Sequence, residues 1–190
     1  MRTFTIPVRI LALLIALLLA SCGGNKSKSP RLALTVGESR LAVNGGSIWY
    51  KIVGEGQGRP VVLLHGGPGF SSYYLKPFED LGDDRQVVRY DQLGCGKSDR
   101  VTDTTMFNIE HFVTELDSLR RYFRLGKMHL VGHSWGTILA LEYYRAYPEH
   151  VASLTLESAV LDAQAYQGHV RQLLATSPDS IQQAVKKAEA

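Results

Sequence analysis

The sequence is poor in cysteine, in net charge and in long apolar runs, and each shortage excludes a class of protein. Two cysteines in 190 residues exclude a disulfide-rich scaffold and any multi-cysteine zinc or iron–sulfur site. The formal net charge of +3 is not clustered, which argues against nucleic-acid binding. An apolar share of 45% and a charged share of 21% are ordinary for a globular chain. At ~150 residues per domain, this length allows one domain.

The apolar run from Ile10 to Ala20 is too short to cross a membrane, because a ~30 Å hydrocarbon core requires about 20 residues. Arg2 and Arg9 precede it, a pattern that is typical of a secretory signal. Leu19-Ala20-Ser21-Cys22 then resembles a bacterial lipobox, in which the chain is cut before a cysteine that carries lipid. The alternative is an uncleaved signal-anchor helix.

We therefore predict a lipoprotein signal peptide at residues 1–21 and a lipidated N-terminus with a polar tether at residues 22–39. Loss of residues 1–21 removes two arginines and no acidic residue, so the net charge falls from +3 to +1. The predicted location is extracytoplasmic, on a bacterial membrane, through a lipid on Cys22. Cys95 is then left without an intrachain disulfide partner.

The rest of the chain alternates between short apolar runs and amphipathic segments. This alternation predicts an α/β fold with a mostly parallel sheet flanked by helices. In such sheets the functional groups gather at the carboxyl ends of the strands. We expect strands at 47–53, 61–64, 86–90, 128–131 and 154–156, and helices at 108–124, 135–147, 164–175 and 180–190.

Gly132-His133-Ser134-Trp135-Gly136 is a G-x-S-x-G motif between a predicted strand and a predicted helix. This is the context of a nucleophile elbow, in which glycines permit a tight turn that projects the serine above the sheet. The helix N-terminus adds positive potential where an oxyanion would develop. The motif predicts Ser134 as a nucleophile, and the alternative is a serine that caps an ordinary helix.

His65-Gly66-Gly67-Pro68-Gly69 directly follows the predicted strand 61–64. In this fold class the loop after that strand provides one oxyanion donor, and the residue after the nucleophile provides the other. We assign these donors to the backbone amides of Gly67 and Trp135. His65 precedes the serine, whereas the base follows it in the order Ser, Asp, His, so we expect His65 to order the loop by hydrogen bonding.

Asp91 to Asp99 follows the predicted strand 86–90 and reads as a wall of the active-site cleft. Asp91 also precedes the serine and does not fit the chain order of a catalytic acid. A nucleophilic Cys95 would need a neighbouring base or a lowered pKa, and Lys97 is the one nearby cation. We therefore expect Cys95 to be a structural loop residue.

Together these three motifs resemble the α/β-hydrolase superfamily, and within it the proline iminopeptidase group with its tricorn-interacting-factor aminopeptidase relatives. The resemblance spans about residues 45 to 190 and implies a serine aminopeptidase. Such an enzyme releases N-terminal residues, often proline, from short peptides through an acyl-enzyme, without a metal or an organic cofactor. Thr137 departs from many relatives, which have a second glycine there, and we expect it to tighten helix–strand packing.

The resemblance also implies an acid and then a histidine after the serine. His150 would lie ~20 Å from Ser134, at the far end of the predicted helix. Asp162 and His169 satisfy the chain order, but helical surface histidines are usually solvated. We therefore divide the remaining chain into a partial hydrolase core at residues 40–162 and the beginning of a helical cap at residues 163–190.

The missing acid and base are expected beyond residue 190, which predicts a fragment with little activity of its own. Two alternatives stay open. One is an esterase or amidase of the same fold, because a fold does not fix the substrate. The other is a non-catalytic, lipid-anchored binding protein that retains the elbow.

Overall fold

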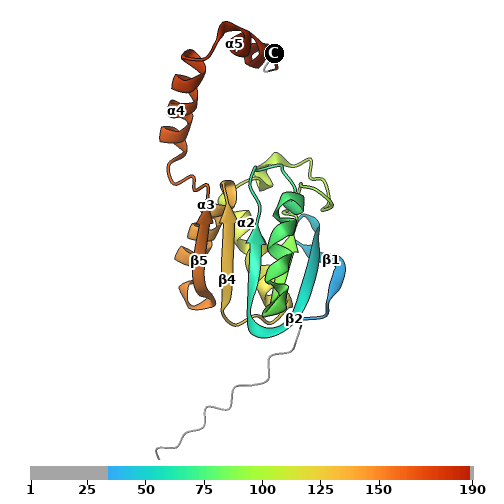
Figure 1. The fold of residues 1–190 in the computed structure, drawn as a ribbon. Coiled ribbons are helices and arrows are strands. Elements are labelled where there is room, and N and C mark those ends of the chain that lie inside the picture. Colours follow the sequence, from blue (N-terminus) through green and yellow to red (C-terminus); the bar gives the residue numbers. More distant parts are fainter. Residues whose placement is uncertain (1–33, 189–190) are drawn as a thin grey trace, which may run out of the picture. The chain divides into compact units, whose positions relative to one another are not determined.

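The computed structural model describes residues 34–188 (Figure 1). The predicted signal peptide, Cys22 and most of the predicted tether lie outside these residues. Among the residues described, no helix is both long and apolar enough to span a membrane.

The centre of the fold is a five-stranded sheet in which β2 contacts three other strands. β1 (Gly37–Val43) pairs with the first half of β2 (Gly46–Leu64) in antiparallel register. β3 (Arg85–Tyr90) pairs with both halves of β2, and β4 (Met128–His133) runs parallel to its second half. β5 (Val151–Glu157) runs parallel to β4 and is the last strand in the sheet.

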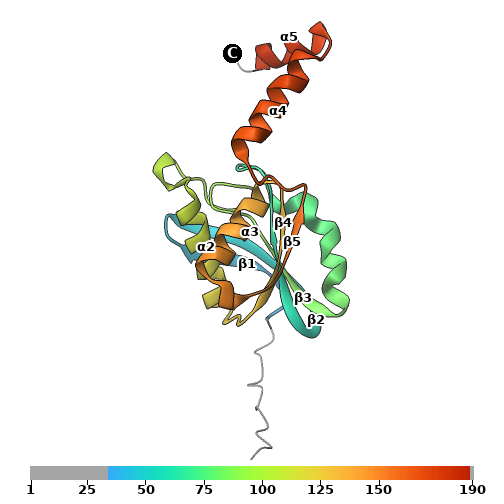
Figure 2. The same cartoon turned by 90° about the vertical axis from the view of Figure 1, so that its left-hand side faces the viewer.

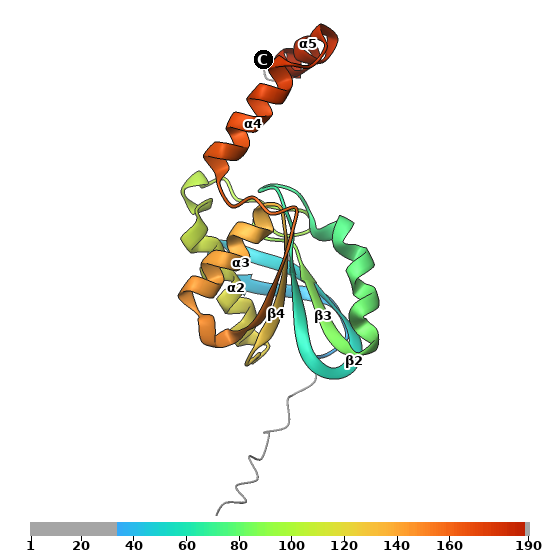
Figure 3. The ribbon, with the colours of Figure 1, turned by 60° about the vertical axis from the view of Figure 1, so that its left-hand side comes forward.

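Helices cover both faces of the sheet, as Figures 2 and 3 show. α2 (Ile109–Tyr122) and α3 (Trp135–Ala146) lie on one face. The 3-10 helix η1 (Ser72–Asp83) lies on the other, and the short helices η2 (Thr104–Met106) and η3 (Pro148–His150) belong to connecting segments. The predicted α/β-hydrolase architecture is thus confirmed for the described part of the chain.

The apolar run in the second half of β2 is buried on both sides because alternate residues face opposite layers. Val61 and Leu63 belong to a small core cluster with Leu75 of η1. Val62 and Leu64 belong to the larger core, which α2 and α3 complete through residues such as Leu116, Leu119, Leu139 and Tyr143.

The segment between the predicted strands 47–53 and 61–64 is part of β2 rather than a separate turn. Its register against β3 shifts repeatedly between Val53 and Leu63. The glycines there allow the bend, because a Cβ on Gly54 would lie 2.5 Å from the carbonyl oxygen of Gly82. The residue pattern predicted the two halves of β2 but did not indicate that they form one continuous strand.

The ordered core begins before residue 40, the predicted start. β1 begins at Gly37, and the buried Leu34 is held by two hydrogen bonds to the side chain of Gln86. The backbone N–H of Leu34 donates to Oε1 at 2.8 Å, and Nε2 donates to the carbonyl oxygen of Leu34 at 2.7 Å. This long-range pairing leaves no local pattern in the sequence.

The last two helices, α4 (Ala163–Ala175) and α5 (Asp179–Ala188), begin and end within two residues of their predicted limits. Asp162 caps α4, because its carboxylate accepts hydrogen bonds of 2.9 Å from the backbone N–H groups of Gln164 and Ala165. Several large apolar side chains of this region are exposed, namely Leu161, Tyr166, Val170, Leu173 and Ile181.

Candidate active site

Ser134 lies at a sharp turn between β4 and α3, with φ of 51° and ψ of −117°. A positive φ is unfavourable for a residue that carries a Cβ, so the surrounding packing must impose it. The two flanking glycines make that packing possible. A Cβ on Gly132 would lie 2.3 Å from the carbonyl oxygen of Gly136, and one on Gly136 would lie 2.1 Å from that of Leu64.

Backbone hydrogen bonds fix the turn, and the serine hydroxyl does not contribute to them. Ser134 occupies the N-cap position of α3, but its side chain makes no capping hydrogen bond. Its backbone N–H donates to the carbonyl oxygen of Glu157 at 3.0 Å. A strained turn whose serine makes no capping bond differs from an ordinary helix cap and has the backbone geometry predicted for a nucleophile elbow.

Thr137 secures the same turn from the helix side. Its hydroxyl donates to the carbonyl oxygen of Ser134 at 2.6 Å and accepts from the backbone N–H of Val160 at 3.2 Å. The side chain is fully buried. Thr137 therefore ties the elbow to the segment that follows β5, and it contributes no group to the pocket.

The glycine loop and the elbow meet because their strands are parallel neighbours that end together, with Leu64 in register with Gly132. Gly66 adjoins Ser134, since a Cβ there would be 3.1 Å from the Cβ of Ser134. Gly67 adopts φ of +125°, a conformation that favours glycine. The predicted oxyanion donors, the amides of Gly67 and Trp135, thus belong to two adjoining loops at the carboxyl edge of the sheet.

His65 is fully buried, and both of its ring nitrogens are engaged. Nδ1 donates to the carbonyl oxygen of Gly66 at 2.8 Å, and Nε2 accepts from the backbone N–H of Gln92 at 2.9 Å. Burial lowers the pKa of His65, which favours this neutral tautomer. With no free lone pair, His65 orders the glycine loop and has no capacity to accept a proton from Ser134.

The side-chain amide of Gln92 joins the glycine loop to the elbow. Its Nε2 donates to the carbonyl oxygen of His65 at 3.0 Å, and its Oε1 accepts from the indole N–H of Trp135 at 3.1 Å. Gln92 is fully buried, and its bond to His65 is shielded from water, whereas its bond to Trp135 is partly buried. The sequence motif contained this residue, but nothing in the motif indicated the bridge.

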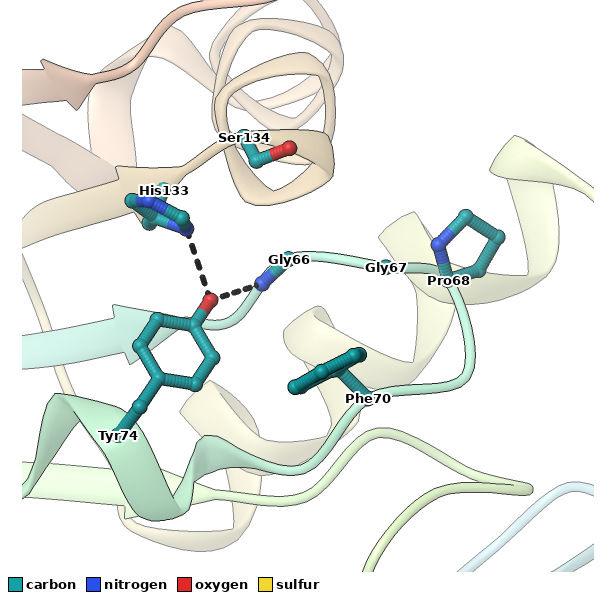
Figure 4. A pocket seen from close by; sticks show the side chains of 7 residues that line it. All are labelled: Gly66, Gly67, Pro68, Phe70, Tyr74, His133 and Ser134. Carbon is teal, nitrogen blue, oxygen red and sulfur yellow. Dashed lines mark hydrogen bonds between the residues drawn. The ribbon is translucent and has the colours of Figure 1, made fainter. Parts of the chain in front are cut away.

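A cavity of about 490 Å³ opens beside Ser134 (Figure 4). The glycine loop provides Gly66, Gly67 and Pro68, and the elbow provides His133 and Ser134. Phe70 and Tyr74 complete the lining, so the polar side-chain groups around the cavity are the hydroxyls of Ser134 and Tyr74 and the imidazole of His133. These two aromatic residues lie outside the sequence motifs and outside any segment with helical or strand periodicity, so no pattern in the sequence indicated them. Gly69 follows the lining residues of the loop, with φ of +102°.

Asp91 directly follows β3 and is almost fully buried. Its carboxylate accepts three hydrogen bonds, from the backbone N–H of Ser72 at 2.6 Å, the hydroxyl of Ser72 at 2.7 Å and the backbone N–H of Lys97 at 2.8 Å. It does not line the cavity beside Ser134. Its position is that of a loop anchor.

Cys95 is also buried, and burial raises the pKa of its thiol, which disfavours the nucleophilic thiolate. It is a free cysteine. Within residues 34–188, no cluster of three or more histidine, cysteine, aspartate or glutamate side chains could hold a metal ion.

In the described part of the chain, none of the three acid and base candidates is hydrogen-bonded to Ser134 or lines the cavity beside it. His150 follows α3 and pairs with Glu149 at 3.4 Å. Asp162 is occupied as the cap of α4, and His169 is an exposed residue on the same helix. No hydrogen bond joins Asp162 to His169 among the residues described, and the role of this pair stays a prediction.

The chain is similar in sequence to several known proteins. Residues 59–190 match the family model described as the alpha/beta hydrolase fold. The chain is 40% identical over 153 residues to the proline iminopeptidase of Heyndrickxia coagulans, covering 80% of this chain and 53% of that protein. It is 39% identical over 157 residues to that of Lactobacillus helveticus, with the same coverage. It thus spans about half the length of the curated relatives that it matches.

The chain is also similar to several solved structures. The proline iminopeptidase of Mycobacterium smegmatis superposes with a TM-score of 0.70 at 25% identity, covering 80% of this chain and 54% of that one. VinJ superposes with a TM-score of 0.73 at 28% identity and the same coverage. An epoxide hydrolase of Vigna radiata, at 23% identity and a TM-score of 0.61 over 67% of this chain and 39% of its own, shares the fold alone.

Proposed function

Since this chain belongs to the α/β-hydrolase fold family, we propose that it is a serine hydrolase in which Ser134 attacks a carbonyl carbon. The observation that carries this proposal is the strained elbow of Ser134. Its hydroxyl caps no helix, and it adjoins both the glycine loop and an open cavity.

In the proposed reaction the Ser134 oxygen bonds to the scissile carbonyl carbon, and a general base takes the hydroxyl proton. The amides of Gly67 and Trp135 donate hydrogen bonds to the oxyanion that forms. The carbon–nitrogen bond then breaks, the amine leaves with a proton, and water hydrolyses the acyl-enzyme. No step requires a metal or an organic cofactor.

We further propose that the substrates are short peptides from which an N-terminal residue, often proline, is released. The support is the similarity to proline iminopeptidases, which exceeds one third identity over most of this chain. Pro68 after the double glycine and Trp135 after the nucleophile add to it, because they distinguish this chain from generic esterases of the fold. A lipid on Cys22 would hold the enzyme at an extracytoplasmic membrane surface.

The 190-residue chain by itself is expected to turn over weakly. A serine hydroxyl is a poor nucleophile without a base, and no histidine within residues 34–188 is hydrogen-bonded to that of Ser134. Turnover close to that of proline iminopeptidases, abolished by His169→Ala, would contradict this expectation and assign the acid and base to Asp162 and His169.

The substrate proposal is tested by comparing a prolyl arylamide with an ester of similar size, using the protein purified from its own host. We expect slow cleavage of the arylamide that exceeds hydrolysis of the ester, and Ser134→Ala serves as the inactive control. Ester hydrolysis without arylamide cleavage would replace the aminopeptidase by an esterase. Absence of both activities, together with retained ligand binding, would indicate a binding protein.

A further inference from the structure

The hydroxyl of Tyr74, in the 3-10 helix η1, contacts both loops that adjoin Ser134 (Figure 4). It accepts a hydrogen bond from the backbone N–H of Gly66 at 2.6 Å. It also lies 2.9 Å from Nδ1 of His133, the residue before the nucleophile. One oxygen atom thus connects the glycine loop to the elbow.

The bond to Gly66 has one possible direction, because a backbone N–H can only donate. The phenol therefore accepts from Gly66, and its own proton can be donated to Nδ1 of His133 when that nitrogen is unprotonated. Burial raises the pKa of the Tyr74 hydroxyl, so the proton that this bond needs is retained at neutral pH.

The ring of Tyr74 is held independently of its hydroxyl. It packs edge-on against Phe70 at 6.2 Å and against the imidazole of His133 at 5.1 Å between ring centroids. A Cβ on Gly66 would lie 3.1 Å from the phenol oxygen and 3.2 Å from Nδ1 of His133, so the three groups are in close contact. Removal of the hydroxyl alone would therefore release the loop without disturbing the aromatic packing.

Gln92 makes the equivalent connection on the other side of the loop, between His65 and Trp135. The glycine loop is therefore held to the elbow at two points. One predicted oxyanion donor, Gly67, directly follows Gly66, and the other, Trp135, is itself bonded to Gln92 through its indole. Two donors on separate loops stabilise one oxygen only if the loops keep a fixed spacing.

We propose that Tyr74 is a positioning residue, whose hydroxyl sets the spacing between the Gly67 and Trp135 amides by bridging Gly66 to His133. This proposal rests on the function proposed for Ser134. It assigns Tyr74 no contact with the substrate carbonyl. Loss of the hydroxyl should slow the reaction of Ser134, by less than the hundredfold or more expected when a donor itself is removed.

The experiment compares the wild type with Tyr74→Phe and with Tyr73→Phe, a matched control. Tyr73 is the adjacent residue, is 75% exposed, and its hydroxyl makes no hydrogen bond among the residues described. Hydrogen exchange of the Gly66 amide is measured first, since it does not depend on activity. We expect this amide to be protected in the wild type and in Tyr73→Phe, and to exchange about tenfold faster or more in Tyr74→Phe, as one lost hydrogen bond implies.

The second readout is the rate at which a fluorophosphonate labels Ser134. We expect Tyr74→Phe to lower the limiting rate about tenfold with little change in probe affinity or melting temperature, a split that a merely stabilising residue would not give. An unprotected Gly66 amide in the wild type, or unchanged labelling in Tyr74→Phe, would overturn the proposal. If no protein is labelled, the function proposed for Ser134 fails, and the Gly66 exchange rates still decide whether the bridge exists.

Discussion

The backbone N–H of Ser134 donates a 3.0 Å hydrogen bond to the carbonyl oxygen of Glu157, the residue at which β5 ends. The strained turn at the nucleophile is therefore stabilised partly by the last strand of the sheet. Leu156, the residue before Glu157, is 36% exposed, so this support lies at the periphery of the core. Because of this bond, we expect that a change which unpairs β5 from the sheet would also disrupt the turn at Ser134.

Gly136→Ala should destabilise the fold by about 3 kcal/mol or more, because overpacking against rigid backbone cannot be relieved by a side-chain movement. The new Cβ would lie 2.1 Å from the carbonyl oxygen of Leu64. Urea unfolding followed by tryptophan fluorescence measures the change. Gly126→Ala is the control, because nothing lies within 4 Å of a Cβ there. Equal stabilities of the two variants would refute the steric argument for the elbow.

Asp91→Ala should lower the stability by about 3 kcal/mol, because it leaves three hydrogen-bond donors without their charged acceptor. Asp80→Ala, at an exposed position of η1, should change it little. Under conditions where both variants are folded, the rate at which Ser134 is labelled should stay close to that of the wild type. A large loss of labelling in folded Asp91→Ala would instead assign Asp91 a part in the chemistry.

Glu115 should make the stability fall as the pH rises. This buried carboxyl on α2 accepts a 3.0 Å hydrogen bond from the backbone N–H of Leu93 through Oε2, whereas Oε1 has no partner. Burial raises the pKa of Glu115 from 4.5 to about 8. Between these values the folded state holds a proton that the unfolded state has lost, which costs up to about 1.4 kcal/mol per pH unit.

Urea unfolding at intervals from pH 5 to pH 8 tests this prediction, with Glu115→Gln as the comparison. The glutamine keeps an oxygen for the N–H of Leu93 but does not titrate. We expect the wild type to lose stability over this range more steeply than the variant. Parallel pH profiles would show that the carboxyl is already ionised in the folded protein.

Lipidation of Cys22 is a separate prediction. The mature protein should begin at Cys22, carry the mass of a diacylglyceryl group and sediment with membranes. Cys22→Ala should remove the lipid and release the protein from the membrane fraction. Mass spectrometry of the purified N-terminus is the direct measurement, and a mature N-terminus elsewhere, without lipid, would contradict the lipobox interpretation.

Local patterns in the sequence were sufficient to predict much of the fold. The apolar run at residues 61–64 indicated a strand buried on both faces, and the amphipathic stripe at 108–124 indicated α2. Both signals reflect burial, which the amino-acid pattern records directly. The bend that joins the halves of β2 has no local signal, because it depends on backbone contacts with Gly82 at the end of η1.

The candidate site also contains residues that a motif predicts and residues that only the structure reveals. The elbow and the glycine loop carry glycines at positions where backbone geometry demands them, so their motifs could be recognised from the sequence. Tyr74 and Gln92 act through side-chain hydrogen bonds between loops that only the folded sheet brings together. An isolated tyrosine or glutamine has no spacing rule, and its role could be found only from the structure.

The central proposal is that Ser134 is a nucleophile, and covalent labelling tests this role most directly. The folded 190-residue chain and its Ser134→Ala variant are incubated with a fluorophosphonate and then mapped by peptide mass spectrometry. We expect one slow but selective adduct on Ser134, which is absent from the variant and from the urea-unfolded chain. No adduct on Ser134 in a folded sample, or equal labelling of other serines, would contradict it.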